Sequence, residues 1–185
     1  AYKKLLSGQD KAGILLPNSL AAAVSFFALQ YAGKIPVMLN FSLGVKQFES
    51  CVKTTKLQTV ISSRRFIEAG KLEKLTEGIK NAGAEIVYLE DFAEKISVLT
   101  KLKGLKKYLR REEVKTSADR PSVILFTSGS EGLPKAVLLS HQNILANVQQ
   151  LRLAVPFNSK DVFLNALPMF HSFGLTVGTI LPLLH

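Results

Sequence analysis

The sequence is poor in cysteine and tryptophan: its 185 residues include one cysteine, Cys51, and no tryptophan. A single cysteine excludes an internal disulfide and is typical of a reducing compartment. A catalytic thiol is one interpretation of Cys51. The residue, however, lies within Phe48-Glu49-Ser50-Cys51-Val52, a segment with a helical pattern. We therefore expect Cys51 to be a small buried apolar side chain.

Acidic side chains are also scarce, with 14 Asp and Glu against 24 Lys and Arg, so the net charge is +10. A basic surface attracts nucleic acid, anionic lipid or acidic proteins. No recognised nucleic-acid-binding motif or aromatic platform accompanies the charge, so the sequence does not support nucleic-acid binding.

Much of the positive charge lies in one segment, residues 101–115. Its basic residues are Lys101, Lys103, Lys106, Lys107, Arg110, Arg111 and Lys115. Leu102, Leu105 and Leu109 are three or four residues apart, which predicts a narrow apolar stripe on a helix. A basic amphipathic helix suits an anionic membrane surface or an acidic carrier protein. The alternative is a solvated helix that packs one face on its own domain, and Gly104 weakens the helix itself.

Charged residues are absent from Val162 to Leu184. A hydropathy window of this kind is one signal of a membrane span. Asn165, Pro168 and His171 interrupt the stretch, so we favour a buried strand, a turn and a helix. The overall composition, 47% hydrophobic and 21% charged, is that of a globular chain.

Short apolar runs alternate with amphipathic stretches along the chain, which predicts an α/β fold with largely parallel sheets and flanking helices. We expect three regions: a first α/β portion at 1–93, a basic amphipathic connector at 94–120, and a second α/β portion at 121–185. The expected strands are 12–16, 35–39, 59–61, 84–89, 122–127, 136–139 and 162–166. The expected helices are 19–31 with Asn18 as N-cap, 44–54, 64–81, 141–154 and a last one from about 172.

The most informative segment runs from Thr127 to Lys135 and reads Thr-Ser-Gly-Ser-Glu-Gly-Leu-Pro-Lys. It is not a Walker A loop, because its glycines are too close and Lys135 does not follow a glycine. It is not a nucleophile elbow, because Ser128 stands where that motif has glycine. Glycines let the backbone curl around an anion, and Lys135 adds a mobile positive charge of the kind that binds phosphate. The simplest ligand is a polyphosphate such as ATP, and the alternative is an ordinary Ser/Gly-rich turn.

This nine-residue segment resembles the phosphate-binding signature of the AMP-forming adenylating superfamily, with every fixed position present. Leu167-Pro168-Met169-Phe170-His171 is similar to a second signature of that family. Further landmarks are Gly13-Ile14-Leu15-Leu16-Pro17-Asn18-Ser19, Tyr31-Ala32-Gly33-Lys34-Ile35-Pro36-Val37 and Leu139-Ser140-His141-Gln142-Asn143. The resemblance implies the large N-terminal domain of a ligase that joins a carboxylic acid to AMP and passes the acyl group to a thiol.

A narrower resemblance is to the acyl-carrier-protein synthetase part of bacterial bifunctional 2-acylglycerophosphoethanolamine acyltransferases. It rests on Leu125 to Gly132, Ile144 to Val148 and Ala166 to Gly178. It implies a fatty acid, acyl carrier protein and a lysophospholipid as partners, and a place on the cytoplasmic side of the bacterial inner membrane. A long-chain or aryl acyl-CoA synthetase using CoA is the alternative. A non-catalytic module that docks on a membrane or a carrier protein is another.

The resemblance also implies roles for single residues. His171 would be catalytic and lie between the acyl group and the nucleotide. Mg²⁺ would accompany ATP, with its usual carboxylate ligand in a later motif. The position of Glu131 is variable in the family pattern, and this residue is given no role. The residues expected to hold the β- and γ-phosphates are Thr127, Ser128, Gly129, Ser130, Gly132 and Lys135.

Several motifs of the superfamily do not occur in these 185 residues: the Tyr-Gly-x-Thr-Glu motif, the ribose-binding Thr-Gly-Asp, and the hinge and catalytic lysine of the small domain. The sequence also starts without methionine. We therefore expect the chain to be a piece of a larger protein.

The isolated chain is therefore predicted to bind nucleotide weakly and to form no acyl-adenylate, because the adenine- and ribose-binding groups are missing. The measurement is acyl-adenylate formation by the purified 185 residues. Robust formation would contradict this prediction.

Overall fold

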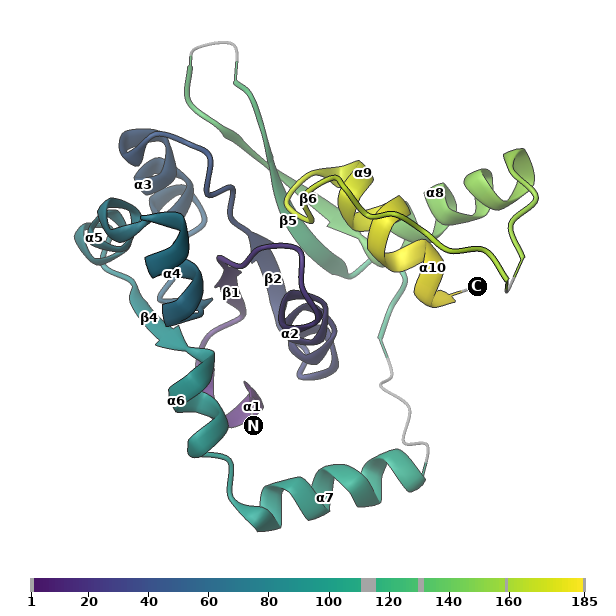
Figure 1. The fold of residues 1–185 in the computed structure, drawn as a ribbon, viewed down its shortest axis with the longest axis horizontal. Helices are drawn as coiled ribbons and strands as arrows, with labels where there is room; N and C mark the ends of the chain where they lie inside the picture. Colours follow the sequence, from purple (N-terminus) through teal and green to yellow (C-terminus); the bar gives the residue numbers. More distant parts are fainter. Residues whose placement is uncertain (1, 111–115, 130–131, 159, 185) are drawn as a thin grey trace.

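The structure, a computed structural model, describes residues 2–110, 116–129, 132–158 and 160–184. Within these residues the fold is built on one six-stranded sheet with the order β4-β3-β1-β2-β5-β6 (Figure 1). All neighbouring pairs are parallel except β5 and β6, which are antiparallel. The strands are β1 (Lys11–Ile14), β2 (Ile35–Met38), β3 (Thr59–Ser62), β4 (Glu85–Tyr88), β5 (Pro121–Thr127) and β6 (Lys135–Ser140).

Helices connect the parallel strands, as crossover connections require. The helix α1 (Tyr2–Leu5) precedes the first strand. The helices between β1 and β5 are α2 (Leu20–Tyr31), α3 (Val45–Thr54), α4 (Arg64–Gly70), α5 (Glu73–Asn81), α6 (Leu89–Glu94) and α7 (Val98–Leu109). After β6 they are α8 (His141–Ala154), α9 (Ser172–Leu175), a π-helical segment η1 (Thr176–Ile180) and α10 (Leu181–Leu184).

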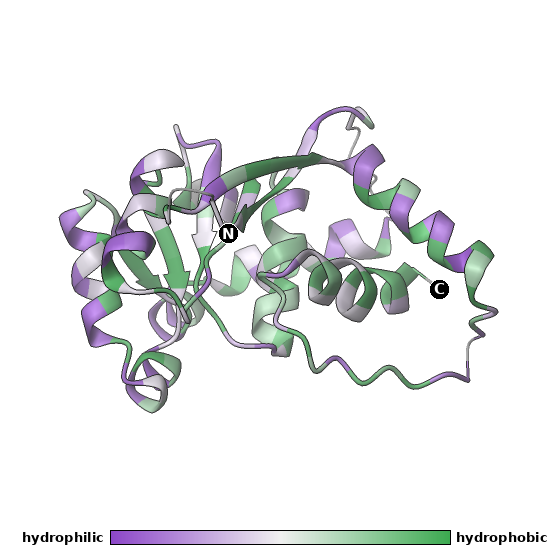
Figure 2. Cartoon of the chain, turned by 90° about the horizontal axis from the view of Figure 1, so that it is seen from above, coloured by the Kyte–Doolittle hydropathy of each residue, from purple (hydrophilic) through white to green (hydrophobic). Residues whose placement is uncertain are grey.

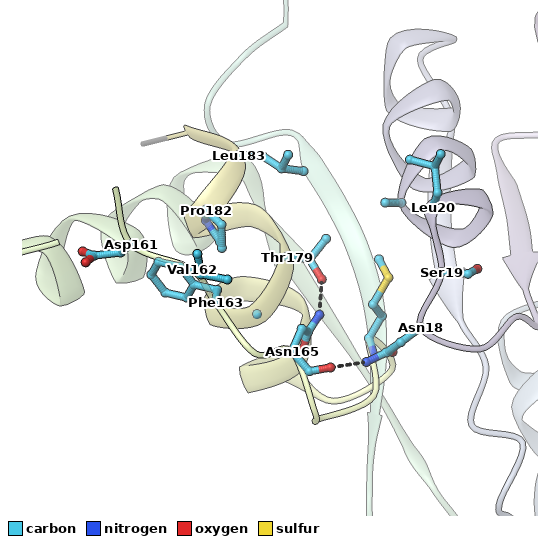
Figure 3. A pocket seen from close by; sticks show the side chains of 13 residues that line it. Asn18, Ser19, Leu20, Asp161, Val162, Phe163, Asn165, Thr179, Pro182 and Leu183 are labelled. Carbon is cyan, nitrogen blue, oxygen red and sulfur yellow. Dashed lines mark hydrogen bonds between the residues drawn. The ribbon is translucent and has the colours of Figure 1, made fainter. Parts of the chain in front are cut away.

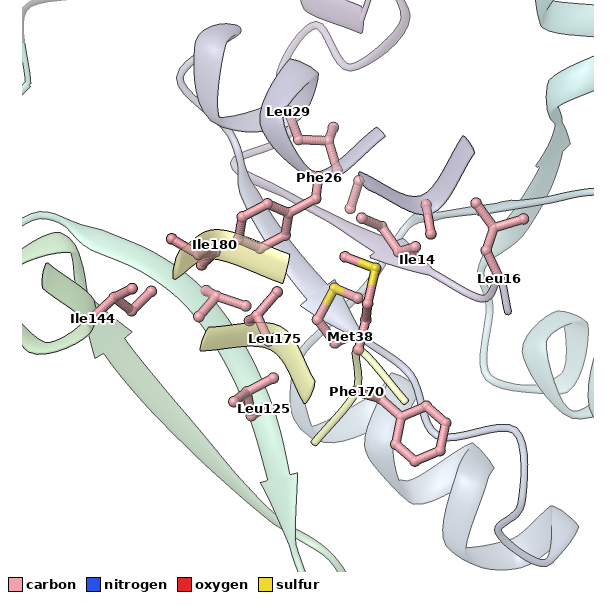
Figure 4. Packing of buried hydrophobic residues seen from close by; sticks show 14 of the residues in the cluster. Ile14, Leu16, Phe26, Leu29, Met38, Leu125, Ile144, Phe170, Leu175 and Ile180 are labelled. Atoms are coloured by element: carbon pink, nitrogen blue, oxygen red, sulfur yellow. The ribbon is translucent and has the colours of Figure 1, made fainter. Parts of the chain in front are cut away.

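Side chains of the strands alternate between two buried clusters, one on each face of the sheet. Ile14, Met38 and Leu125 face α2, α8 and the C-terminal helices, and the closely packed side chains of this cluster are drawn in Figure 4. Leu15 and Val37 point the other way, toward α3, α4 and α5. The central strands are therefore largely hydrophobic, while many hydrophilic residues lie on the helices around them (Figure 2). The predicted α/β fold with a mostly parallel sheet and flanking helices is confirmed.

Three expectations about local structure are wrong. The N-cap of α2 is Ser19, whose hydroxyl accepts the N–H of Ala22, and not Asn18. The single helix expected over 64–81 is divided into α4 and α5. The first ends where Lys71 adopts the left-handed conformation (φ 52°) and the N–H of Leu72 binds the carbonyl of Ile67, which is a helix-terminating arrangement.

The strand expected at 162–166 does not form, although all of these residues lie in the described part of the chain. The carbonyls of Asn165 and Leu167 accept hydrogen bonds from the side chain of Asn18. The Asn165 side chain binds the hydroxyl of Thr179. Because side chains satisfy these groups, the segment is held as an extended loop without a neighbouring strand.

The division at residues 93 and 121 stays a prediction. Strands from both of the expected α/β portions pair in the same sheet, since Val37 of β2 is aligned with Ile124 of β5. Within the described ranges, no helix combines the length and the apolar character needed to cross a bilayer.

Cys51 is buried in α3, as expected, and burial raises the pKa of its thiol to about 12. At pH 8 the thiolate fraction would be on the order of 10⁻⁴, against a sizeable fraction for a free cysteine.

We predict that the native protein does not react with a thiol reagent such as DTNB at pH 8. The same chain unfolded in guanidinium should react with one equivalent. Fast reaction of the native chain would contradict the burial of this side chain.

Candidate functional site

The candidate site lies at the carboxyl edge of the sheet, where the segments that follow β1, β2 and β5 meet. Parallel strands bring their carboxyl ends to one edge, and open α/β sheets bind ligands there. Asn18 follows β1, Phe41 follows β2, and the loop from Ser128 follows β5. The predicted phosphate loop is attached to this edge because it follows β5 in the chain. The predicted histidine loop is attached to it by hydrogen bonds to Asn18.

The phosphate loop is closed by its glycines. The N–H of Gly132 binds the carbonyl of Gly129 at 3.2 Å, and Gly132 has a φ of +79°, a conformation that other residues rarely adopt. A Cβ added at Gly129 would lie 2.0 Å from the carbonyl oxygen of Leu133. From outside the loop, the Gln47 side chain of α3 donates to the carbonyl of Gly132 at 2.8 Å. Only glycine therefore fits position 129 without a backbone shift.

The antiparallel pairing of β5 and β6 aligns Thr127 with Lys135 at the mouth of the loop. Cross-strand partners lie on the same face of a sheet, so a hydroxyl and an ammonium group are presented together. Thr127, Ser128 and Lys135 are exposed, as is Gly132. The structure therefore brings five of the six predicted phosphate-binding residues into one accessible loop. Ser130, the sixth, and Glu131 lie outside the described residues.

The histidine loop is held to the end of β1 by one side chain, that of Asn18. Its amide nitrogen donates to the carbonyls of Leu167 (2.8 Å) and Asn165 (3.2 Å). Its amide oxygen accepts the backbone N–H of Met169 at 2.9 Å. Asn18 thus substitutes for a neighbouring strand and fixes both sides of the turn around Pro168.

The helix that follows packs tightly against the same loop. A Cβ at Gly174 would lie 2.2 Å from the carbonyl oxygen of Pro168, and one at Gly178 would lie 2.0 Å from the side-chain oxygen of Asn165. Thr179 donates to the carbonyl of Gly174 and accepts from the Asn165 amide. The π-helical turn of η1 widens the backbone at this point, a feature that is frequent at functional sites.

His171 is exposed at the N-cap of α9, at the end of a row of aromatic side chains. Its ring lies 4.7 Å from that of Phe170, which packs edge-on against Phe41 at 5.0 Å, and Phe41 in turn contacts Phe66. Phe170 is buried, whereas the imidazole reaches solvent. His171 is therefore not a core histidine, and its ring is free to meet a ligand at the carboxyl edge.

A cavity of about 590 Å³ adjoins the histidine loop (Figure 3). Asn18, Asn165 and Thr179 line its inner side, where their hydrogen bonds are drawn as dashed lines. Apolar side chains make up most of the remaining wall, namely Leu20, Val162, Phe163, Met169, Pro182 and Leu183. The cavity has the size of a small-molecule pocket and an apolar lining with a few polar groups.

Two carboxylates on α6, the helix that follows β4, are already engaged. Arg64 forms a two-pronged ion pair with Asp91, at 2.5 and 2.7 Å, and this hydrogen bonding lowers the pKa of the Asp91 carboxyl. Burial alone would raise the pKa of Glu90, but hydrogen bonds from the Ser63 hydroxyl and nearby backbone N–H groups lower it overall. Among the described residues there is no group of three or more His, Cys, Asp or Glu side chains that could hold a metal ion.

His141 lies away from the candidate site, at the amino edge of the sheet. It follows β6 and its N–H binds the carbonyl of Arg120, the residue before β5. Burial, and then the positive charge of Arg120, lower the pKa of His141. The side chain lines a second cavity of about 310 Å³ together with Arg120 and Lys34.

The fold and the loops on its carboxyl edge define an open α/β sheet protein with a glycine-rich loop after β5. The chain belongs to the AMP-binding enzyme family, whose model matches residues 5–185. It is 27% identical over 178 residues to 4-coumarate–CoA ligase 4 of Arabidopsis thaliana, with 90% of this chain and 30% of that protein covered. It is 24% identical over 202 residues to the long-chain-fatty-acid–CoA ligase of Salmonella typhimurium, with 93% and 35% covered. The chain thus spans about a third of the length of these relatives.

Solved structures show the same fold. ATP-bound MatB from Rhodopseudomonas palustris superposes with a TM-score of 0.72 at 23% identity, over 94% of this chain and 33% of that one. MenE from Bacillus subtilis, in complex with AMP, superposes with a TM-score of 0.70 at 20% identity, over 94% and 41%. At this identity the likeness establishes the fold of the chain.

Sequence reasoning missed the residues that hold the site together. Asn18 was expected to cap a helix, and Asn165 was regarded only as an interruption of an apolar stretch. Phe41 and Thr179 were not singled out. The sequence offered one signal for the role of Asn18, namely its place directly after Pro17. Asparagine side chains outside helices and strands readily form hydrogen bonds with backbone groups.

Replacement of Asn18 by alanine tests this arrangement. We predict that Asn18→Ala lowers the free energy of unfolding by about 1–2 kcal/mol, because three hydrogen bonds to the histidine loop are lost at a partly exposed position. Asn147, exposed on α8, provides the matched control, and Asn147→Ala should change stability by less than about 0.5 kcal/mol. The measurement is urea unfolding of both variants. Equal stabilities would show that Asn18 does not hold the loop.

Proposed function

We propose that this chain is the nucleotide- and acid-binding part of an ATP-dependent ligase that activates a carboxylic acid as its acyl-adenylate. The observation that carries the proposal is that the loop after β5 and the His171 loop, held by Asn18, are attached to one edge of a largely parallel sheet, in a chain of the AMP-binding enzyme family. Because the chain spans about a third of its relatives, the complete activity is proposed for a longer protein that contains it.

The geometry of the phosphate loop fits a polyphosphate. Gly129 packs against its own loop with no room for a side chain, and the exposed hydroxyls and Lys135 surround it. Backbone N–H groups in such a curled segment bind anionic oxygen, and the lysine supplies charge. We propose that Thr127, Ser128, Gly129, Ser130, Gly132 and Lys135 hold the β- and γ-phosphates of ATP. The ATP in the similar MatB structure supports the choice of nucleotide.

The apolar cavity beside the histidine loop supports an acyl substrate. Most of its wall is aliphatic and aromatic. Asn18, Asn165 and Thr179 line it beside the histidine loop, and Asp161 lines it farther from Asn18 (Figure 3). An apolar acid would place its chain along Leu20, Phe163 and Leu183 and its carboxylate toward His171. Relatives of this chain include a fatty-acid and an aryl CoA ligase, so both acid classes remain candidates.

The proposed reaction is a substitution at the α-phosphorus of ATP. A carboxylate oxygen of the acid forms a bond to that phosphorus, the bond to the β-phosphate oxygen breaks, and pyrophosphate leaves with the electron pair. The chain contributes by orienting the two reactants and by neutralising charge on the phosphates. His171, exposed beside Phe170, would donate a hydrogen bond to the carboxylate or the α-phosphate.

Mg²⁺ is proposed as the ion that accompanies the nucleotide. It commonly binds phosphate oxygens with only one or two protein carboxylates. Asp91 and Glu90 are already bound to Arg64 and Ser63, so they are poor candidates for that role. When bound with ATP, the ion would supply charge neutralisation on the phosphates.

A finer proposal follows from the sequence resemblance. The parent protein would be an acyl-carrier-protein synthetase joined to a 2-acylglycerophosphoethanolamine acyltransferase on the cytoplasmic side of the bacterial inner membrane. Its partners would be a fatty acid, acyl carrier protein and a lysophospholipid. Transfer to CoA, as the names of the relatives state for those proteins, is the competing proposal. Comparing acyl carrier protein with CoA as acceptor decides between them.

The activation step is tested by ATP–pyrophosphate exchange in the full-length protein with long-chain fatty acids. We predict acid-dependent exchange that Lys135→Ala lowers on the order of 100-fold, because a positive charge beside the departing pyrophosphate is lost. Lys74, exposed on α5, is the matched control, and Lys74→Ala should leave exchange unchanged. Absence of exchange with fatty, aryl and amino acids would contradict the proposal that the protein activates a carboxylic acid. Equal exchange rates for Lys135→Ala and Lys74→Ala would contradict the proposal that Lys135 binds the phosphates.

A further inference from the structure

Helix α7 has a continuous apolar stripe. Val98, Leu102, Leu105 and Leu109 are four, three and four residues apart, so they lie on one face of the helix. Between 53% and 71% of each of these side chains is exposed. None of the twelve residues of α7, all of them described, is buried. A stripe of this kind on a soluble surface signals an interaction site.

The stripe points away from the rest of the molecule. On the side of α7 that faces α2, the ammonium group of Lys107 lies over the face of Tyr31, 5.9 Å from the ring centre. Lys107 is two residues from both Leu105 and Leu109, a step of about 200° around a helix. The side of α7 that faces the domain is therefore its polar side, and the leucines face outward. This arrangement contradicts the alternative in which the helix packs its apolar face on its own domain.

Positive charge surrounds the stripe. The segment 98–110 contains five basic residues, Lys101, Lys103, Lys106, Lys107 and Arg110, and no acidic residue. By helical spacing, Lys101 and Lys106 lie on opposite borders of the stripe. Tyr108 lies on the same border as Lys101, about two turns farther along the helix. Lysines in this position extend their stems along apolar surface and place their charge at the level of lipid head groups, where tyrosine is also favoured.

The place of α7 in the fold suits a flat surface. The helix is the outermost element at the bottom of Figure 1, whereas the ends of β5 and β6 that carry the phosphate loop lie at the top. Tyr31, which contacts α7, is the last residue of α2 and lies near the start of β2, at the amino edge of the sheet. A planar partner on α7 would leave the carboxyl edge open to solvent.

We propose that α7 lies in the interface of an anionic lipid bilayer, with Val98, Leu102, Leu105 and Leu109 among the acyl chains and the lysines at the anionic head groups. Charge complementarity favours this occupant over a second copy of the chain, because two α7 helices would repel each other through their basic residues. The proposal is independent of the adenylating activity, since the contact lies on the opposite edge of the sheet from the phosphate loop.

The test is flotation of the full 185-residue chain with vesicles of phosphatidylglycerol and phosphatidylcholine, with pure phosphatidylcholine vesicles as the uncharged comparison. Binding is expected only to the anionic vesicles and should weaken as salt rises. The double substitution Leu102→Gln and Leu105→Gln should weaken binding by more than about tenfold, because two apolar side chains no longer enter the lipid. The matched control is Leu145→Gln with Leu153→Gln, two exposed leucines on α8, which should bind like the unmodified chain.

Because the chain contains no tryptophan, a single introduced tryptophan reports insertion directly. The emission of Tyr108→Trp should shift to shorter wavelength on anionic vesicles, while that of Leu153→Trp should not. Unshifted emission from Tyr108→Trp, or equal binding of the stripe and control variants, would overturn the proposal. If the chain does not bind vesicles, and the Leu102→Gln, Leu105→Gln variant alone elutes at a different volume in size-exclusion chromatography, a second copy of the chain covers α7 instead.

Discussion

The hydrogen bonds of the Asn18 side chain are the contacts on which the candidate site most depends. The segment 162–171 has no strand beside it among the described residues, so its backbone groups need other partners. Asn18 supplies them at three points, from the segment that follows β1. Asn165 and Thr179 continue the network into the helix that follows. A loop that would otherwise move independently is thereby fixed to the central strand of the sheet, and His171 with it.

The two edges of the sheet differ in what they offer. The carboxyl edge carries the glycine-rich loop, the aromatic row that ends at His171 and an apolar cavity. The amino edge carries a smaller cavity with Lys34, Arg120 and His141, and the basic helix α7 contacts Tyr31 on this side. Burial and the positive charge of Arg120 hold the pKa of His141 below its usual value. The proposed nucleotide site and the proposed lipid contact therefore lie on opposite edges of the sheet.

The fold could be predicted from the sequence because each central strand is a short apolar run followed by an amphipathic helix. Residues 35–38, for example, are apolar on both faces, as a strand covered on both sides requires. The glycine-rich loop between β5 and β6 could be located because its glycine, hydroxyl and lysine residues are neighbours in the sequence, and its role in binding phosphate stays a prediction. The role of Asn18 could not, because its partners lie about 150 residues away in the chain. The strand expected at 162–166 was wrong for the same reason: its hydrogen bonds are made to distant side chains.

The central claim, that the carboxyl edge binds ATP, is tested most directly by amide chemical shifts of the isotope-labelled chain during titration with ATP. This method detects weak binding, which is what we expect of a chain that spans a third of its relatives. The account predicts that shifts concentrate at Gly129, Gly132, Lys135 and the residues around His171. Shifts that instead concentrate around Lys34, Arg120 and His141 at the amino edge, or no shifts at millimolar ATP, would contradict it.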